Sequence, residues 1–137
     1  MVRRIFGVAL VAIMVLGGNA VAQAPSAKKS ASSDRALKQW IGDLKAESPQ
    51  VRNAAAYEIA SMGPAGAKAV PALIEALDDS EASVRFPATV ALGEIGPAAK
   101  AAVPRLKEMV EQEINDEVAA GARRALKRID PAAVATE

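Results

Sequence analysis

The sequence predicts an all-α fold: an α-α superhelix (solenoid) of about three stacked helix pairs. A loop is written twice, because "MGPAGAKAVPAL" (62–73) and "IGPAAKAAVPRL" (95–106) share seven of twelve residues at a spacing of 33. Apolar residues within a unit recur at helical steps, as in Leu37, Trp40, Ile41 and Leu44. A fixed period of this length is typical of repeat proteins, whose units bury their apolar faces by stacking.

Residues 1–22 have the layout of a bacterial-type signal peptide. Two arginines precede an uncharged apolar run over residues 5–16, and small residues follow. A membrane-spanning helix needs about 20 apolar residues, so this run is short for a span. Ala-x-Ala sites end at Ala22 and Ala24, and we expect cleavage after Ala22 because the second site would leave Pro25 directly after the cut. We expect a periplasmic or secreted protein with no stable membrane insertion after cleavage. The alternatives are an uncleaved anchor and an ordinary buried helix.

The rest of the chain divides into a linker, three repeats and a tail. Residues 23–33, "QAPSAKKSASS", are small and polar and predict a flexible linker. The repeats cover about 34–66, 67–99 and 100–131, and residues 132–137 form a C-terminal tail. We expect first helices near 34–46, 68–78 and 102–113, and second helices near 49–62, 82–95 and 116–129.

The repeated loop stops one helix and starts the next. Gly63 and Gly96 fall where the second helices must end, and we expect left-handed C-terminal caps there. Pro71 and Pro104 fall near the first turn of the next helix, where a missing N–H costs little. Pro87 interrupts the second helix of the middle unit, so this helix either starts late, near residue 83 or 84, or is kinked.

The third unit departs from the other two. Its later positions match the second unit at an offset of 34, one residue more than the period of the first two. Asp130 replaces the loop glycine, and the second helix gains four basic residues: Arg123, Arg124, Lys127 and Arg128. Terminal repeats need a polar outer face, so we expect this unit to close the stack.

Composition excludes several classes of chemistry. The 137 residues include no Cys and no His, which removes disulfides, the usual zinc and haem sites and the Ser-His-Asp triad. Basic residues number 17 and acidic residues 16, and residues 23–137 carry 15 and 16, a net charge of −1. A dedicated nucleic-acid binder would show a basic excess. We therefore expect no cofactor, no metal, no nucleic-acid partner and no enzymatic activity.

The second helices resemble those of the HEAT-repeat family. The segment "SVRFPATVALGEIGPAA" (83–99) is similar to the short HEAT-like repeats first associated with phycobilisome lyases. The segments "VRNAAAYEIASMGPAG" and "VAAGARRALKRIDPAA" are looser copies, and the resemblance covers about residues 34–135. It implies an armadillo/HEAT-type superhelix.

The same resemblance implies a ladder between repeats, made by an Asp and an Arg six positions apart. Asp79 and Arg85 have this spacing. Ala46 replaces the acid of the first unit and Ala119 replaces the arginine of the third. We therefore expect at best a partial ladder.

The resemblance also implies that second helices line the concave side, where outward positions contact partners. The candidate protein-binding residues are Asn53, Tyr57, Phe86, Val90, Glu94, Arg124 and Arg128. The function expected is that of an exported protein-interaction or scaffold module for a protein partner that the sequence does not identify. A self-associating assembly subunit and a lyase-like enzyme are the alternatives, and Phe86 could instead pack against the neighbouring repeat.

Overall fold

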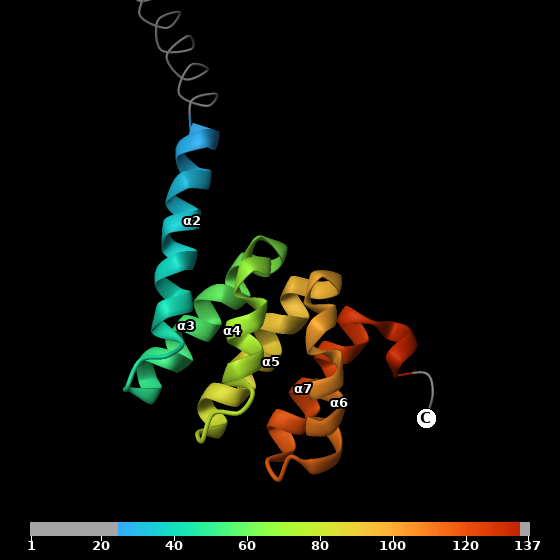
Figure 1. Cartoon of the computed structure of the whole chain (residues 1–137). Coiled ribbons are helices and arrows are strands. Elements are labelled where there is room, and N and C mark those ends of the chain that lie inside the picture. The colour runs from blue at the N-terminus through green and yellow to red at the C-terminus, as the bar shows by residue number, and fades with distance from the viewer. Residues whose placement is uncertain (1–24, 135–137) are drawn as a thin grey trace, which may run out of the picture. The chain divides into compact units, whose positions relative to one another are not determined.

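The computed structural model describes residues 25–134, and every regular element in this range is a helix. The described residues divide into two units, with residues 25–36 in the first and residues 37–134, which hold the repeats, in the second. The helix α2 (Pro25–Asp43) runs across this division (Figure 1). Residues 25–33 are therefore helical, which corrects the linker prediction: proline suits the first helical position, and Ala and Lys favour helices. No described helix is long and apolar enough to cross a membrane.

The other helix pairs follow the predicted order. The second helices have the predicted bounds: α3 (Pro49–Met62), α5 (Ala82–Ile95) and α7 (Asp116–Ile129). The first helices α4 (Val70–Ala76) and α6 (Val103–Gln112) are shorter than predicted. The repeated loop forms the 3-10 helices η1 (Gly63–Ala69) and η2 (Gly96–Ala102), and η3 (Pro131–Ala133) follows α7. Pro71 and Pro104 lie in the first turns of α4 and α6, as predicted.

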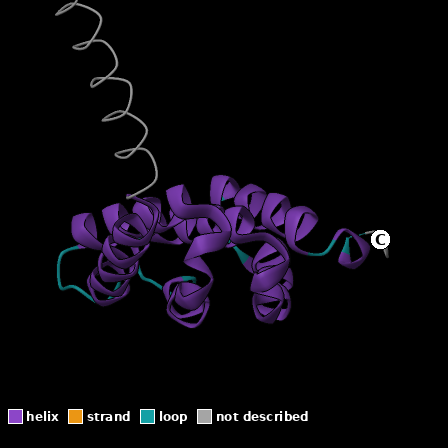
Figure 2. Ribbon diagram, turned by 90° about the horizontal axis from the view of Figure 1, so that it is seen from above, coloured by secondary structure: helices purple, strands orange, loops and turns teal. Residues whose placement is uncertain are grey.

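The helices of the repeat unit form two layers, with α4 and α6 in one and α3, α5 and α7 in the other (Figure 1, Figure 2). The core is aliphatic, and its fully buried side chains include Ile59, Leu73, Leu92 and Leu106. The most extensive packing joins α3 to α5 and α5 to α7. The second helices therefore form one continuous row.

Small residues bring α5 and α7 into close contact. A Cβ atom added at Gly121 would lie 2.4 Å from Oγ1 of Thr89, and one added at Gly93 would lie 3.2 Å from Cα of Ala125. The Thr89 hydroxyl is fully buried and donates to the carbonyl of Phe86 at 2.7 Å. A larger residue at Gly93 or Gly121 would therefore push the two helices apart.

The outer face of α7 is polar. The positions at which α5 buries Thr89 and Gly93 hold Arg123 and Lys127 in α7, and both of these side chains are exposed. Two cations at the stacking positions disfavour the packing of a further repeat, because both would have to be desolvated. This agrees with the prediction of a polar terminal repeat, and it assigns that role to two of the four basic residues.

The repeated loop requires glycine at its first residue. Gly63 has φ 55° and ψ −134°, and Gly96 has φ 77° and ψ −141°. A left-handed helical cap would have a ψ angle of about +47°. The cap geometry predicted for these two glycines is therefore wrong. The observed region is open almost only to glycine. In the third unit Asp130 has φ −148°, an extended conformation that needs no glycine.

The helix α5 begins at Ala82 and continues through Pro87, its sixth residue, so the predicted late start is wrong. Proline has no N–H, and the carbonyl of Ser83 therefore loses its usual partner within the helix. The side-chain amide of Asn53, from α3, donates a hydrogen bond to this carbonyl. The first repeat thus satisfies a group that the proline leaves open in the second.

An arginine from each of the first two units bonds to an acid of the next unit. Arg52 donates to both carboxylate oxygens of Asp79, at 2.7 and 3.0 Å. Arg85 donates to both oxygens of Glu113, at 2.8 Å each. The remaining nitrogen of each arginine donates to two backbone carbonyls just before its own second helix.

The ladder is therefore complete between the three units, which corrects the expectation of a partial one. Glu113 is the third unit's acid, at offset 34 from Asp79. Each arginine bonds to the carboxylate of the following unit, and Arg85 bonds to Asp79, six positions before it, only at the backbone carbonyl. Two ladder positions hold alanine instead of a charged residue. Ala46 would face a repeat before the first unit, and Ala119 would face a repeat after the third.

Candidate functional site

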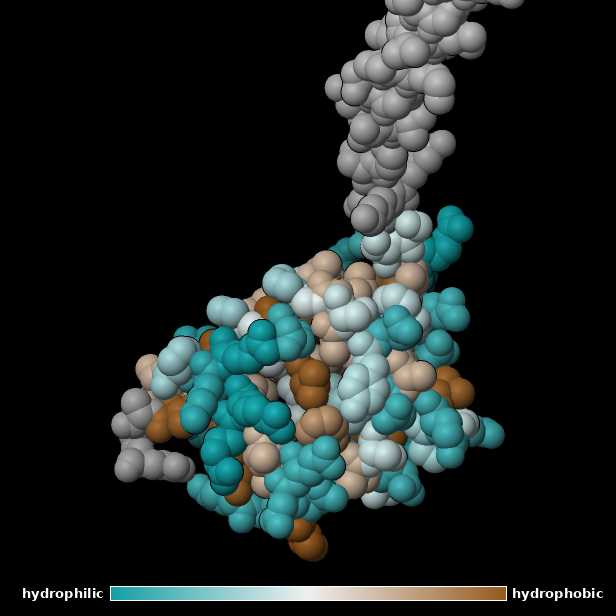
Figure 3. Space-filling model, turned by 180° about the vertical axis from the view of Figure 1, so that it is seen from behind, coloured by the Kyte–Doolittle hydropathy of each residue, from teal (hydrophilic) through white to brown (hydrophobic). Residues whose placement is uncertain are grey.

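The residues predicted to bind a partner all lie on the second helices and reach solvent. We call their solvent-facing side the second-helix surface; it consists of Asn53, Tyr57, Phe86, Val90, Glu94, Arg124 and Arg128. Tyr57 is 45% exposed, both arginines are exposed and the other four are half-buried. Figure 3 shows the molecule from behind the view of Figure 1, with hydrophilic surface around a few hydrophobic patches.

Two hollows divide these residues. The Tyr57 hollow lies toward the beginnings of α5 and α7, and its lining includes Asn53, Tyr57, Phe86 and Glu117. The Arg124 hollow lies further along the same two helices, and its lining includes Val90, Glu94, Arg124 and Arg128. The predicted row is thus two adjacent depressions that share α5 and α7.

In the Tyr57 hollow, several polar groups already have partners. The Asn53 amide bonds to the Ser83 carbonyl. Asn115 caps α7 by accepting hydrogen bonds from the N–H groups of Glu117 and Val118, both at 3.1 Å. Asn53 therefore holds two repeats together, and Tyr57 is the more available group for a partner.

Phe86 is less available to a partner than predicted. Its ring packs on α7, because a Cβ atom added at Gly121 would lie 3.3 Å from the ring carbon Cδ2. Phe86 and Val90 both belong to the half-buried residues packed against the core. Packing against the neighbouring repeat therefore accounts for part of the Phe86 ring, while the rest lines the Tyr57 hollow.

In the Arg124 hollow, two of the predicted residues bind each other. Arg128 donates to both carboxylate oxygens of Glu94 through its two terminal nitrogens. Arg124 has a single hydrogen bond among the described residues, from Nε to the carbonyl of Ala120 in its own helix at 3.4 Å. The hollow therefore contains one neutralised ion pair and one guanidinium without a carboxylate partner in residues 25–134.

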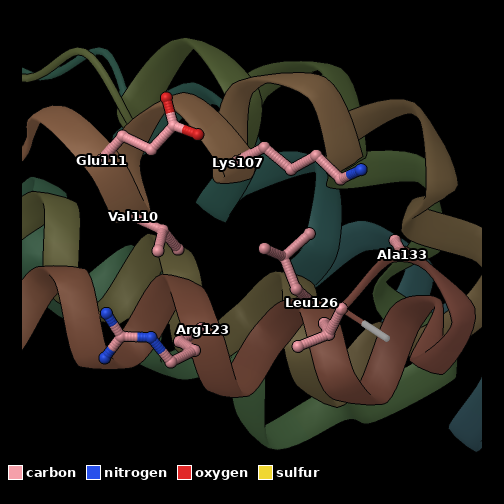
Figure 4. A pocket seen from close by; sticks show the side chains of 7 residues that line it. Lys107, Val110, Glu111, Arg123, Leu126 and Ala133 are labelled. Atoms are coloured by element: carbon pink, nitrogen blue, oxygen red, sulfur yellow. The ribbon is translucent and has the colours of Figure 1, made fainter. Parts of the chain in front are cut away.

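A third depression, which the sequence did not predict, lies at the end of the stack. This end hollow is lined by residues of α6, α7 and the segment after α7: Lys107, Val110, Glu111, Arg123, Leu126, Ala133 and Val134. Figure 4 shows Lys107 and Glu111 on α6 opposite Arg123 on α7, with Val110 and Leu126 between them. Its apolar floor comes from the amphipathic pattern of α6 and α7. The hollow could not be predicted from the sequence, because helical spacing alone does not show where η3 leaves a gap.

The acids with perturbed titration belong to the ladder and not to either hollow of the second-helix surface. The hydrogen bond from Arg85 is the main cause that holds the pKa of Glu113 below its ordinary 4.5. For Asp79, burial acts first and raises the pKa, but Arg52, the N–H of Glu81 and the charge of Arg85 together bring it below 3.8. The four ladder side chains are only 9–18% exposed, so these ion pairs serve packing between repeats.

No group of three or more acidic side chains in the described part of the chain is arranged to hold a metal ion. The acids that line the two hollows are Glu94, paired with Arg128, and Glu117, at the first turn of α7. The chemistry that this surface offers is thus aromatic contact, apolar contact and one unpaired cation.

Comparison with protein families matches residues 35–127 to HEAT repeats. No curated protein matches the chain. The matched range covers α3, α5 and α7 as far as Lys127, and hence every residue of the second-helix surface except Arg128.

Proposed function

The chain belongs to the HEAT-repeat family, and on this premise we propose that it is a protein-interaction or scaffold module that binds a partner through the second-helix surface. Members of this family act in general by protein interaction. The narrower likeness to phycobilisome-lyase repeats stays a prediction.

The observation that carries the proposal is the row formed by Tyr57, Val90 and Arg124 on three adjacent helices. Each occupies the same position of its repeat, and each reaches solvent. Tyrosine and arginine are enriched among the energetic anchors of protein interfaces. An aromatic, an aliphatic and a cationic group side by side offer a partner both burial and a directional contact.

The proposal includes export. Residues 1–22 lie outside the described residues, and their charge, apolar run and Ala-x-Ala site are those of a signal peptide. We place the working protein in the periplasm or outside the cell, beginning at Gln23. In that compartment a domain without Cys depends on its core and its ladder for stability.

Self-association through the end faces is disfavoured. Arg123 and Lys127 occupy the stacking positions of α7, and they would have to be desolvated in an end-to-end contact. Such a contact would also lack a ladder, because Ala46 and Ala119 take the two outer ladder positions. Binding a partner through the second-helix surface requires neither the desolvation of these two cations nor a ladder.

The test is affinity purification from an envelope fraction with matched variants. The wild-type protein and Lys100→Glu, a charge reversal at an exposed loop residue, are expected to retain the same partner. A Tyr57→Ala, Arg124→Glu double variant is expected to lose it while its circular dichroism stays unchanged. Equal retention of the partner by the folded double variant would overturn the proposal.

A further inference from the structure

The exposed side of α7 carries more cations than the two that close the end of the repeat array. Four cations, Arg123, Arg124, Lys127 and Arg128, are exposed on this helix. Arg123 and Lys127 occupy stacking positions, where they close the end of the repeat array. Arg128 is neutralised by Glu94. Arg124 has neither role, since its equivalents in the other units are Tyr57 and Val90 of the second-helix surface.

The guanidinium of Arg124 stands at the rim of a depression that its neighbours keep open. Gly93 and Gly121 line the Arg124 hollow and contribute no side chain, and Val90 supplies an apolar wall. The hollow measures about 130 Å³. Small-molecule sites span roughly 300–1,000 Å³, so this one has room for a single amino-acid side chain.

The net charge around the hollow favours the binding of one anion. Arg124 and Arg128 contribute two positive charges and Glu94 one negative, so the net charge is +1. A guanidinium binds a planar carboxylate through two parallel hydrogen bonds, and this geometry is stronger and more selective than a single charge contact. An aspartate or glutamate side chain fits both the charge and the size of the hollow.

We infer that the second-helix surface recognises an acidic segment of a protein, with one Asp or Glu carboxylate of that segment bound by Arg124. This inference rests on the proposed function, because it names the kind of partner that the same surface takes. A membrane of anionic lipid fits less well, since attraction to a lipid surface draws on clusters of about four or more cations, whereas the net charge around this hollow is +1.

The test is selection from a phage-displayed library of random 12-residue peptides on the purified full chain. We expect the selected peptides to be enriched in Asp and Glu. Synthetic copies should bind about tenfold more weakly to Arg124→Gln, as loss of a charge-assisted hydrogen bond predicts, and equally to Lys100→Gln. Arg124→Lys should recover only part of the affinity, because lysine keeps the charge but not the paired donors.

The other outcomes are decisive as well. Selected peptides that lack acidic residues but lose binding to Tyr57→Ala would leave the proposed function standing and overturn this inference. Peptides insensitive to both substitutions, or no selected peptide at all, would count against both. Binding to phosphatidylglycerol vesicles that Arg124→Gln abolishes, without acidic peptides in the selection, would replace the protein segment with a lipid surface. Because Arg124 is exposed and outside the core, its variants are expected to fold.

Discussion

Replacing Gly121 with alanine tests how tightly the second helices pack. The added Cβ would lie 2.4 Å from Oγ1 of Thr89 and 3.3 Å from the ring of Phe86. Thr89 cannot easily turn aside, because it is branched at Cβ and its hydroxyl is bonded to the Phe86 carbonyl. Overpacking costs about 1–3 kcal/mol, whereas alanine gains about 1 kcal/mol over glycine within a helix. A contact as short as 2.4 Å calls for the upper end of that range. We therefore expect a net loss of about 2 kcal/mol.

Urea unfolding followed by circular dichroism would measure this loss. Gly42→Ala is the matched control, because nothing lies within 4 Å of its added Cβ; this variant is expected to be at least as stable as the wild type. Gly121→Ala should cost less in a Thr89→Ala background, where the clashing oxygen is absent. A Gly121→Ala protein as stable as the wild type would refute the close approach of α5 and α7.

Three further predictions concern the ladder, the proline and the N-terminus. Glu113→Gln is expected to lower the free energy of unfolding by about 2 kcal/mol at pH 7, while Glu111→Gln, on the exposed side of α6, changes it little. Folding lowers the pKa of Glu113, so its contribution to stability is present above the ordinary 4.5 and disappears as the pH falls through the folded value; in acid titrations of stability, the Glu113→Gln protein should therefore approach the wild type as the pH falls below 4.5. Asn53→Ala should destabilise the wild type by about 1–2 kcal/mol but have less effect in a Pro87→Ala background, where the helix can satisfy the Ser83 carbonyl itself; equal losses in both backgrounds would contradict that account. Mass spectrometry of the protein from its native envelope should give Gln23 as the first residue, and an intact Met1 in the membrane fraction would instead indicate an anchor.

The bounds of the second helices could be predicted because their signals are local. Glycine at residues 63 and 96 and the apolar spacing within each unit locate these helices without any knowledge of neighbours. The ψ angle of those glycines could not be predicted, since a positive φ is compatible with several conformations and the following 3-10 helix selects one. The start of α2 was misjudged because serine, alanine and lysine occur in both linkers and helices.

Contacts between repeats were harder to predict than helices. Glu113 was overlooked as a ladder acid because the third unit is one residue longer, and the ladder pairs an arginine with an acid 27 or 28 residues later. The bond between Asn53 and the Ser83 carbonyl likewise depends on a proline in one repeat and an amide in another.

The repeat register placed the candidate residues on one surface, but it did not show how they divide. Which of these side chains already bond to, or pack against, other residues depends on their conformations, and the repeat spacing does not determine those conformations. The structure pairs Glu94 with Arg128, packs Phe86 on α7 and leaves Tyr57 and Arg124 as the available groups.

Site-specific photo-crosslinking in the native host tests the central claim most directly. Photo-reactive benzoylphenylalanine would replace Tyr57 on the second-helix surface and, as a matched control, Lys107 on the exposed side of the first helix α6. The account predicts a discrete crosslinked protein from position 57, absent at position 107 and lost when Arg124→Glu is added. The same crosslinked protein from position 107 but not from position 57 would show that the partner binds another face of the stack.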